Sequence, residues 1–111
     1  MTINELGKVS AEIEKEKGWL EEERSPLEIA ALVHSEISEF VEDYRDAKSY
    51  VGGWELSPLT KKPQGPATEM ADAIIRILGY CHRQGWDMDA VIAAKTAFNR
   101  TRPYRHGNKK F

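Results

Sequence analysis

Apolar residues recur every three or four positions along most of the chain, which is the spacing of an amphipathic helix. The first such segment covers about residues 2–20, and it opens with Thr2 and Glu5 at the spacing of a capping box. A second segment covers about residues 25–48, and it opens with a serine followed by Pro26, a favoured first-turn residue. The pattern therefore predicts two helices, the second of about six turns.

Two more helices are expected after a segment that is rich in glycine and proline. Residues 47–66 contain three glycines and three prolines, which favours a loop over a helix or a central strand. Helical spacing resumes over residues 67–85, and Asp87 is placed to cap a last helix over about residues 88–99. Because no alternating pattern of useful length predicts a strand, we expect an all-α four-helix bundle, formed by a single domain over residues 1–111.

Four acidic residues on the second and third predicted helices are the first candidates for chemistry. Glu36 lies within the apolar stripe of its helix and Glu39 follows at the next turn, while Glu69 and Asp72 repeat this spacing at the edge of the next stripe. If the two stripes pack together, the four carboxylates converge and repel one another. A hard divalent cation would offset that repulsion, with Mg²⁺ favoured and Mn²⁺ as an alternative. Other acidic pairs on the second helix have the same spacing, so a solvated acidic face is the competing interpretation.

Charge is distributed unevenly along the chain, and the basic C-terminal end is a candidate for binding an anionic partner. Residues 1–46 hold 13 of the 18 acidic residues but 5 of the 16 basic ones. On the last helix, Lys95, Asn99 and Arg102 recur on one side, where they would donate hydrogen bonds to a triphosphate. A solvated basic helix end is the alternative.

The tail, residues 100–110, has few aromatic residues, so we expect it to close over phosphate or to pack on a neighbouring subunit rather than to bind nucleic acid.

The number of cysteines and the hydropathy of the chain indicate the cellular compartment in which the protein is expected. The single cysteine, Cys81, has no intrachain disulfide partner and cannot build a cysteine zinc site. The longest apolar run, residues 71–80, is too short and too interrupted to span a membrane, and the first residues lack the apolar core of a signal peptide. We therefore expect a cytoplasmic protein with no membrane partner.

Two motifs resemble those of a known family. The pairs Glu36-x-x-Glu39 and Glu69-x-x-Asp72 resemble the E-x-x-E and E-x-x-D signature of the all-α nucleoside triphosphate pyrophosphohydrolases, the MazG-like proteins and their dCTP- and dUTP-hydrolysing relatives. The Lys95-x-x-x-Asn99 sequence and the basic tail after it are similar to the fourth-helix and tail motif of the same family. Together the two motifs cover the chain from Ser25 to its end.

The resemblance implies an activity and a set of site residues. The reaction is Mg²⁺-dependent hydrolysis of a nucleoside triphosphate, with a deoxynucleotide favoured, to the monophosphate and pyrophosphate. The four acids would hold the metal, and Glu36 and Glu39 would take part in catalysis, Glu39 being the preferred base that orients the attacking water. Lys95, Asn99 and Arg102 would bind the phosphates. Trp19 lies off the apolar stripe of the first helix and would stack on the base, with packing on a neighbouring helix as the alternative.

Relatives of this kind are dimers or tetramers, and the second helix carries apolar residues on additional sides, so we expect a homo-oligomer. Two other functions stay open: phosphoribosyl-ATP pyrophosphohydrolase, which shares the acid pattern, and a non-catalytic helical interaction module. Two departures from the family pattern leave the substrate undefined. The segment over residues 40–68 is long, and Arg76 stands where some relatives that bind a cytosine nucleotide have a tyrosine.

Overall fold

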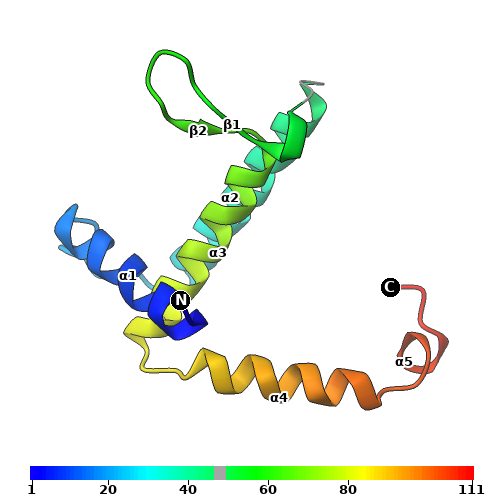
Figure 1. The fold of residues 1–111 in the computed structure, drawn as a ribbon. Helices are drawn as coiled ribbons and strands as arrows, with labels where there is room; N and C mark the ends of the chain where they lie inside the picture. The colour runs from blue at the N-terminus through cyan, green and yellow to red at the C-terminus, as the bar shows by residue number, and fades with distance from the viewer. Residues whose placement is uncertain (47–49) are drawn as a thin grey trace.

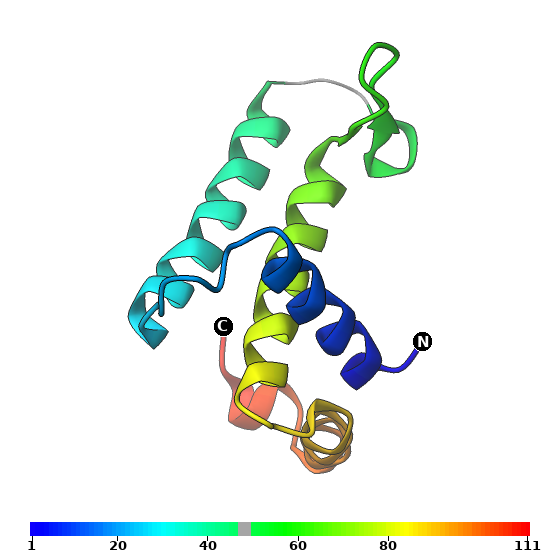
Figure 2. The same cartoon turned by 90° about the vertical axis from the view of Figure 1, so that its left-hand side faces the viewer.

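Helices α1 (Ile3–Glu16), α2 (Pro26–Arg45) and α3 (Pro66–Arg83) form the packed part of the protein. The computed structural model describes residues 1–46 and 50–111. Helices α2 and α3 run antiparallel, side by side, and α1 lies across the C-terminal half of α3 (Figures 1 and 2). The protein is therefore mostly helical, as the apolar spacing predicts.

Two glycines allow α1 to approach α3 closely. A Cβ atom on Gly7 would lie 2.7 Å from the backbone carbonyl oxygen of Leu78, so only a residue without a side chain fits there. Gly79 has the same role on α3, where a Cβ would meet the side chains of Ser10 and Glu14. This crossing fixes α1 against the half of α3 that is distant from Glu69 and Asp72.

The capping box predicted at Thr2 is present, and Ser25 forms a second one with Glu28 at the predicted start of the next helix. The first helix ends at Glu16 rather than near residue 20, because Gly18 adopts a φ of +82°. The backbone N–H groups of Gly18 and Trp19 then donate to carbonyls of the last helical turn, which closes the helix. The predicted end of the second helix near Lys48 falls outside the described residues.

The segment predicted as a loop contains short regular elements. A 3₁₀ turn, η1 (Val51–Gly53), precedes a two-stranded antiparallel hairpin of β1 (Glu55–Leu56) and β2 (Pro63–Gln64), in which Glu55 pairs with Gln64. Strands of two residues are too short to show an alternating pattern, so the sequence analysis missed them. Helix α3 then starts at Pro66, and Thr68, a possible cap from its position, instead donates its hydroxyl to the Gly65 carbonyl.

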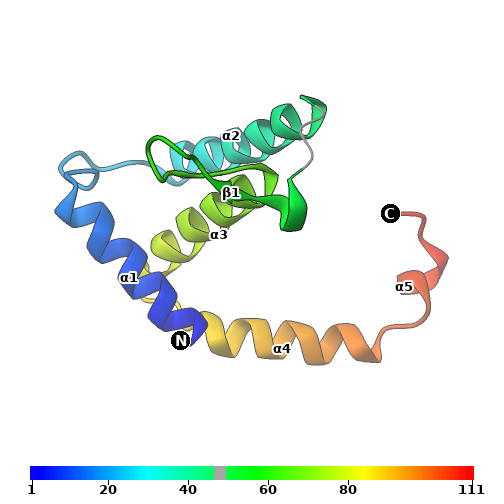
Figure 3. The ribbon, with the colours of Figure 1, turned by 45° about the horizontal axis from the view of Figure 1, so that its top comes forward.

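Helix α4 (Met88–Thr101) begins at the Asp87 cap that the sequence predicts, but it leads away from the other helices (Figures 1 and 3). It is joined to α1 at their N-terminal ends, where Asn4 accepts a hydrogen bond from the Met88 N–H and Asp89 accepts from Ile3 and Asn4. A short C-terminal helix, α5 (Arg105–Asn108), follows. Within the described residues, one chain therefore does not close the expected bundle of four helices, because α4 packs on neither α2 nor α3.

One chain leaves much of its apolar surface exposed. The radius of gyration is 16.8 Å, against about 13 Å for a compact domain of this length. No large side chain among the described residues is fully buried. None of the described helices is long and apolar enough to cross a membrane. The exposed large apolar side chains include Ile13 on α1, Ile37 and Val41 on α2, Met70, Ile74 and Ile77 on α3, and Val91, Ile92 and Phe98 on α4.

Candidate metal centre

Three of the four predicted metal ligands meet where α2 and α3 lie side by side. Glu36 comes from the middle of α2, and Glu69 and Asp72 come from the first two turns of α3. One carboxylate oxygen from each of the three lies within 4.8 Å of the others. The antiparallel packing produces this arrangement, because the i, i+3 spacing keeps Glu69 and Asp72 on one side of α3 while α2 presents Glu36 opposite them.

Glu36 is the most constrained member of this group. Its side chain is only 8% exposed, and its Oε1 accepts a hydrogen bond from the Arg76 Nε at 2.9 Å. Its other oxygen, Oε2, is buried and has no hydrogen-bond partner among residues 1–46 and 50–111. A buried charged oxygen without a partner carries a substantial desolvation cost, so this atom is available to a ligand that supplies positive charge.

The remaining predicted ligand, Glu39, lies outside this group of three but close to one member of it. Burial and a side-chain hydrogen bond with Glu39 raise the pKa of Glu69 to about 7, and the charges of Glu39 and Asp43 add to the shift. Burial and the charge of Glu36 also raise the pKa of Asp72, although Arg76 and Lys62 partly offset this. For both residues burial is the largest cause of the raised pKa, and the neighbouring negative charges add to it.

The donor set fits a hard divalent cation. All of the side chains that converge offer carboxylate oxygens, which Mg²⁺ and Mn²⁺ prefer, and the group contains neither a cysteine nor a histidine. The partnerless Oε2 of Glu36 provides a buried ligand atom, while Asp72 is exposed and leaves the site open to water and to a second ligand. The residues present therefore match a metal that keeps open coordination positions.

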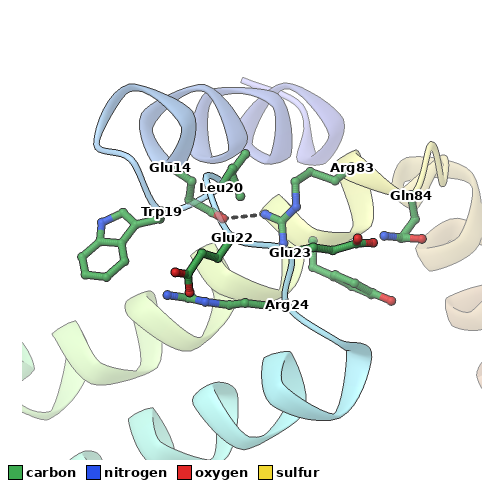
Figure 4. A pocket seen from close by; sticks show the side chains of 9 residues that line it. Glu14, Trp19, Leu20, Glu22, Glu23, Arg24, Arg83 and Gln84 are labelled. Atoms are coloured by element: carbon green, nitrogen blue, oxygen red, sulfur yellow. Dashed lines mark hydrogen bonds and ion pairs between the residues drawn. The ribbon is translucent and has the colours of Figure 1, made fainter.

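A pocket of about 230 Å³ lies between the end of α1 and the C-terminal half of α3 (Figure 4). Trp19, 59% exposed, lines it together with Tyr80, and the guanidinium of Arg24 lies 5.5 Å from the centre of the Trp19 ring. Arg83 lines the same pocket and donates a hydrogen bond to Glu14. Trp19 is thus placed on an open pocket rather than in a helix interface.

A small cavity adjoins this pocket. Arg24 and Arg83 line both the pocket and the cavity, and Arg76, the partner of Glu36, lines the cavity as well. Three arginines therefore lie between the Trp19 pocket and Glu36. The sequence analysis did not assign these arginines, although Arg76 and Arg83 lie seven residues apart and so share one side of α3.

The predicted phosphate ligands are not near the acids in the same chain. Lys95 and Asn99 are exposed on α4, and Arg102 follows its last turn. Helix α4 begins beyond the C-terminal end of α3. The part of α3 from Asp72 to that end is already about 16 Å long. Figures 1 and 3 show α4 continuing away from that point. One chain therefore does not bring Lys95 and Asn99 to the four acids.

Comparison of the chain with family models, with curated proteins and with solved structures gives no match.

Proposed function

We propose that the protein is a Mg²⁺-dependent nucleoside triphosphate pyrophosphohydrolase that releases pyrophosphate and a nucleoside monophosphate. One observation carries this proposal: a buried glutamate oxygen without a partner, on Glu36, in a group of three converging carboxylates. On a solvated acidic face the carboxylate oxygens would contact water, whereas this oxygen of Glu36 is buried. The resemblance of the two acidic pairs to those of MazG-like enzymes supplies the reaction.

In this proposal the acids divide into two roles. Glu36, Glu69 and Asp72 hold the cation, which would neutralise phosphate charge and lower the pKa of a bound water. Glu39 lies outside the group of three yet close enough to affect Glu69, so it takes the role of the base that orients water toward the α-phosphorus.

The pocket at Trp19 receives the nucleoside in this proposal. An exposed indole ring and the Tyr80 ring offer stacking surfaces of suitable size for a base. Arg24, Arg83 and Arg76 lie between that pocket and the acids, and guanidinium groups pair well with phosphate oxygens. The nucleotide would therefore extend from Trp19 toward the carboxylates.

We also propose that a second copy of the chain completes the site. On α4, Val91, Ile92 and Phe98 share one side of the helix with Lys95 and Asn99, at 100° per residue. A surface that covers these exposed apolar residues would therefore meet Lys95 and Asn99 as well. The exposed apolar residues of α2 and α3 offer such a surface in a neighbouring copy, and Val33 and Ile77 line an open groove between the two helices. Light scattering should show a dimer or a larger oligomer at micromolar concentration, and a monomer would contradict this part.

Hydrolysis in ¹⁸O-labelled water tests the reaction. The protein would be incubated with Mg²⁺ and each common ribonucleoside and deoxyribonucleoside triphosphate, with phosphoribosyl-ATP included. Attack at the α-phosphorus puts the label in the monophosphate and leaves pyrophosphate unlabelled. Orthophosphate as the first product would refute the proposal. If no compound is hydrolysed and calorimetry detects no Mg²⁺ binding, the interaction module becomes the better account of the chain.

A further inference from the structure

The ion pair between Arg76 and Glu36 lies inside the group of residues proposed to bind metal. Arg76 is on α3, one turn after Asp72, and its Nε donates to Glu36 Oε1 at 2.9 Å. The two partners differ in exposure, since the Glu36 side chain is 8% exposed and the Arg76 side chain 38%. The carboxylate is therefore held in place, whereas the guanidinium has access to solvent and to the narrow cavity toward Arg83.

The charges around this pair are predominantly negative. Glu69 and Asp72 belong to the same group as Glu36, and the charges of Glu39 and Asp43 also act on Glu69. On the positive side, Arg76 and Lys62 act on Asp72. Arg76 is thus a cation in direct contact with the metal-binding group as the protein stands without metal.

We propose that Arg76 is a resident counter-ion, which a divalent cation displaces from Glu36 when it binds. This inference rests on the metal-binding part of the proposed function. A guanidinium and a divalent ion at one carboxylate repel each other strongly at separations of a few ångströms, so binding of the ion favours withdrawal of Arg76. Because the Arg76 side chain is 38% exposed, its guanidinium can move away from Glu36 toward solvent.

The displacement has a consequence for the order of binding. Without metal, Glu36 engages the Nε of Arg76 and partly neutralises its charge, which weakens its attraction for an anion. After displacement the whole guanidinium is free to pair with an anion, on the side of α3 that Arg83 shares. Metal binding then provides two groups that attract phosphate, which are the metal ion and the displaced Arg76 guanidinium.

Mg²⁺ titrations of Arg76 variants by calorimetry test the inference, with the metal alone as ligand. Arg76→Gln should bind Mg²⁺ about tenfold more tightly than the parent, because one positive charge next to the ion is removed. It should also melt at a lower temperature in EDTA, because Glu36 loses its partner. Arg76→Lys keeps the charge and should bind Mg²⁺ with an affinity close to that of the parent.

Arg83→Gln is the matched control, since Arg83 lies on the same side of α3 and pairs with Glu14 outside the acidic group. It should lower the melting temperature without changing Mg²⁺ affinity. An independent measurement on the parent is the ¹⁵N NMR signal of the Arg76 Nε–H, which should shift on addition of Mg²⁺ while that of Arg83 stays in place.

Two different failures are distinguishable. If the parent binds Mg²⁺ and Arg76→Gln binds it equally or more weakly, or if the Arg76 signal does not move, the counter-ion role is wrong and the metal site stands. If neither the parent nor any variant binds Mg²⁺, the proposed function fails together with this inference.

Discussion

The two ends of α3 use the same kinds of residues in opposite ways. Toward its C-terminus, Arg83 pairs with Glu14 of α1, and each charge meets one partner. Two turns earlier, Arg76 pairs with Glu36 of α2, but Glu69 and Asp72 crowd the same place. One end therefore has balanced charges and joins two helices, whereas the other has an excess of negative charge.

This difference separates structural from functional use of charge. A balanced pair that is partly exposed adds modest stability and needs nothing further. An unbalanced group costs free energy in the metal-free protein, and this cost is reflected in the raised pKa values of Glu69 and Asp72. A positively charged ligand that binds there would offset this cost.

The largest expected effect comes from removing the buried ligand atom. Glu36→Gln should lower turnover by about a hundredfold or more, because the amide is a poor ligand for Mg²⁺. The Gln oxygen can still accept from Arg76, so circular dichroism should show an unchanged fold. Glu42→Gln removes a charge from the exposed side of α2 and should leave turnover intact. Undiminished turnover in Glu36→Gln would show that the two ends of α3 do not differ in function.

The second effect concerns which chain of an oligomer supplies Lys95 to the acidic residues near the N-terminal end of α3. Lys95→Ala should lower turnover by about tenfold to a hundredfold, the worth of one charge-assisted hydrogen bond to phosphate. If Lys95 reaches the acids of a neighbouring copy, mixed oligomers of Lys95→Ala and Glu36→Gln contain some intact sites. Doubly tagged mixed oligomers should then recover a large part of the parent turnover. A mixture as inactive as its two components would place each site within one chain.

A third effect is stabilisation by the metal. Mg²⁺ at about a hundred times its Kd should stabilise the folded state by about 2.7 kcal/mol, because only the folded chain gathers the acids. Thermal unfolding with Mg²⁺ and with EDTA measures this as a rise in melting temperature. The rise should be lost in Glu69→Gln and in Asp72→Asn, and retained in Arg83→Gln at the balanced end. Equal rises in all these proteins would exclude the proposed ligands.

The smallest expected effect is on pH dependence without metal. The pKa of Glu69 is about 7 in the folded chain and 4.5 as its usual value, so the folded state binds more protons between these pH values. The folded state therefore loses stability as the pH rises through this window, and the penalty is fully present above about 7. Glu69→Gln should melt higher than the parent at pH 8 and close to it at pH 4.5, by a few degrees at most because the side chain is partly exposed. An equal difference at both pH values would contradict the raised pKa.

The pattern of residues along the chain was sufficient to predict the four longer helices and where each begins, but not η1, α5 or the end of α1. Capping boxes, the proline at a first turn and the glycine after a last turn act through hydrogen bonds and φ restrictions within a few residues. Such signals are present in the sequence itself, at Thr2, Ser25 and Asp87. The acidic pairs were also visible there, because the i, i+3 spacing sets their side of each helix.

Only the tertiary structure decided which of these groups meet. The pairing of Arg76 with Glu36 joins residues 40 positions apart, and no local pattern distinguishes it from the pairing of Arg83 with Glu14. The joint of Asn4 with Asp87 and Asp89 likewise depends on how two helix ends come together. That joint directs α4 away from the acids, so the separation of Lys95 from Glu36 within one chain could not be read from the sequence. Helical periodicity specifies the side of a helix on which a residue lies, whereas long-range packing determines what lies opposite it.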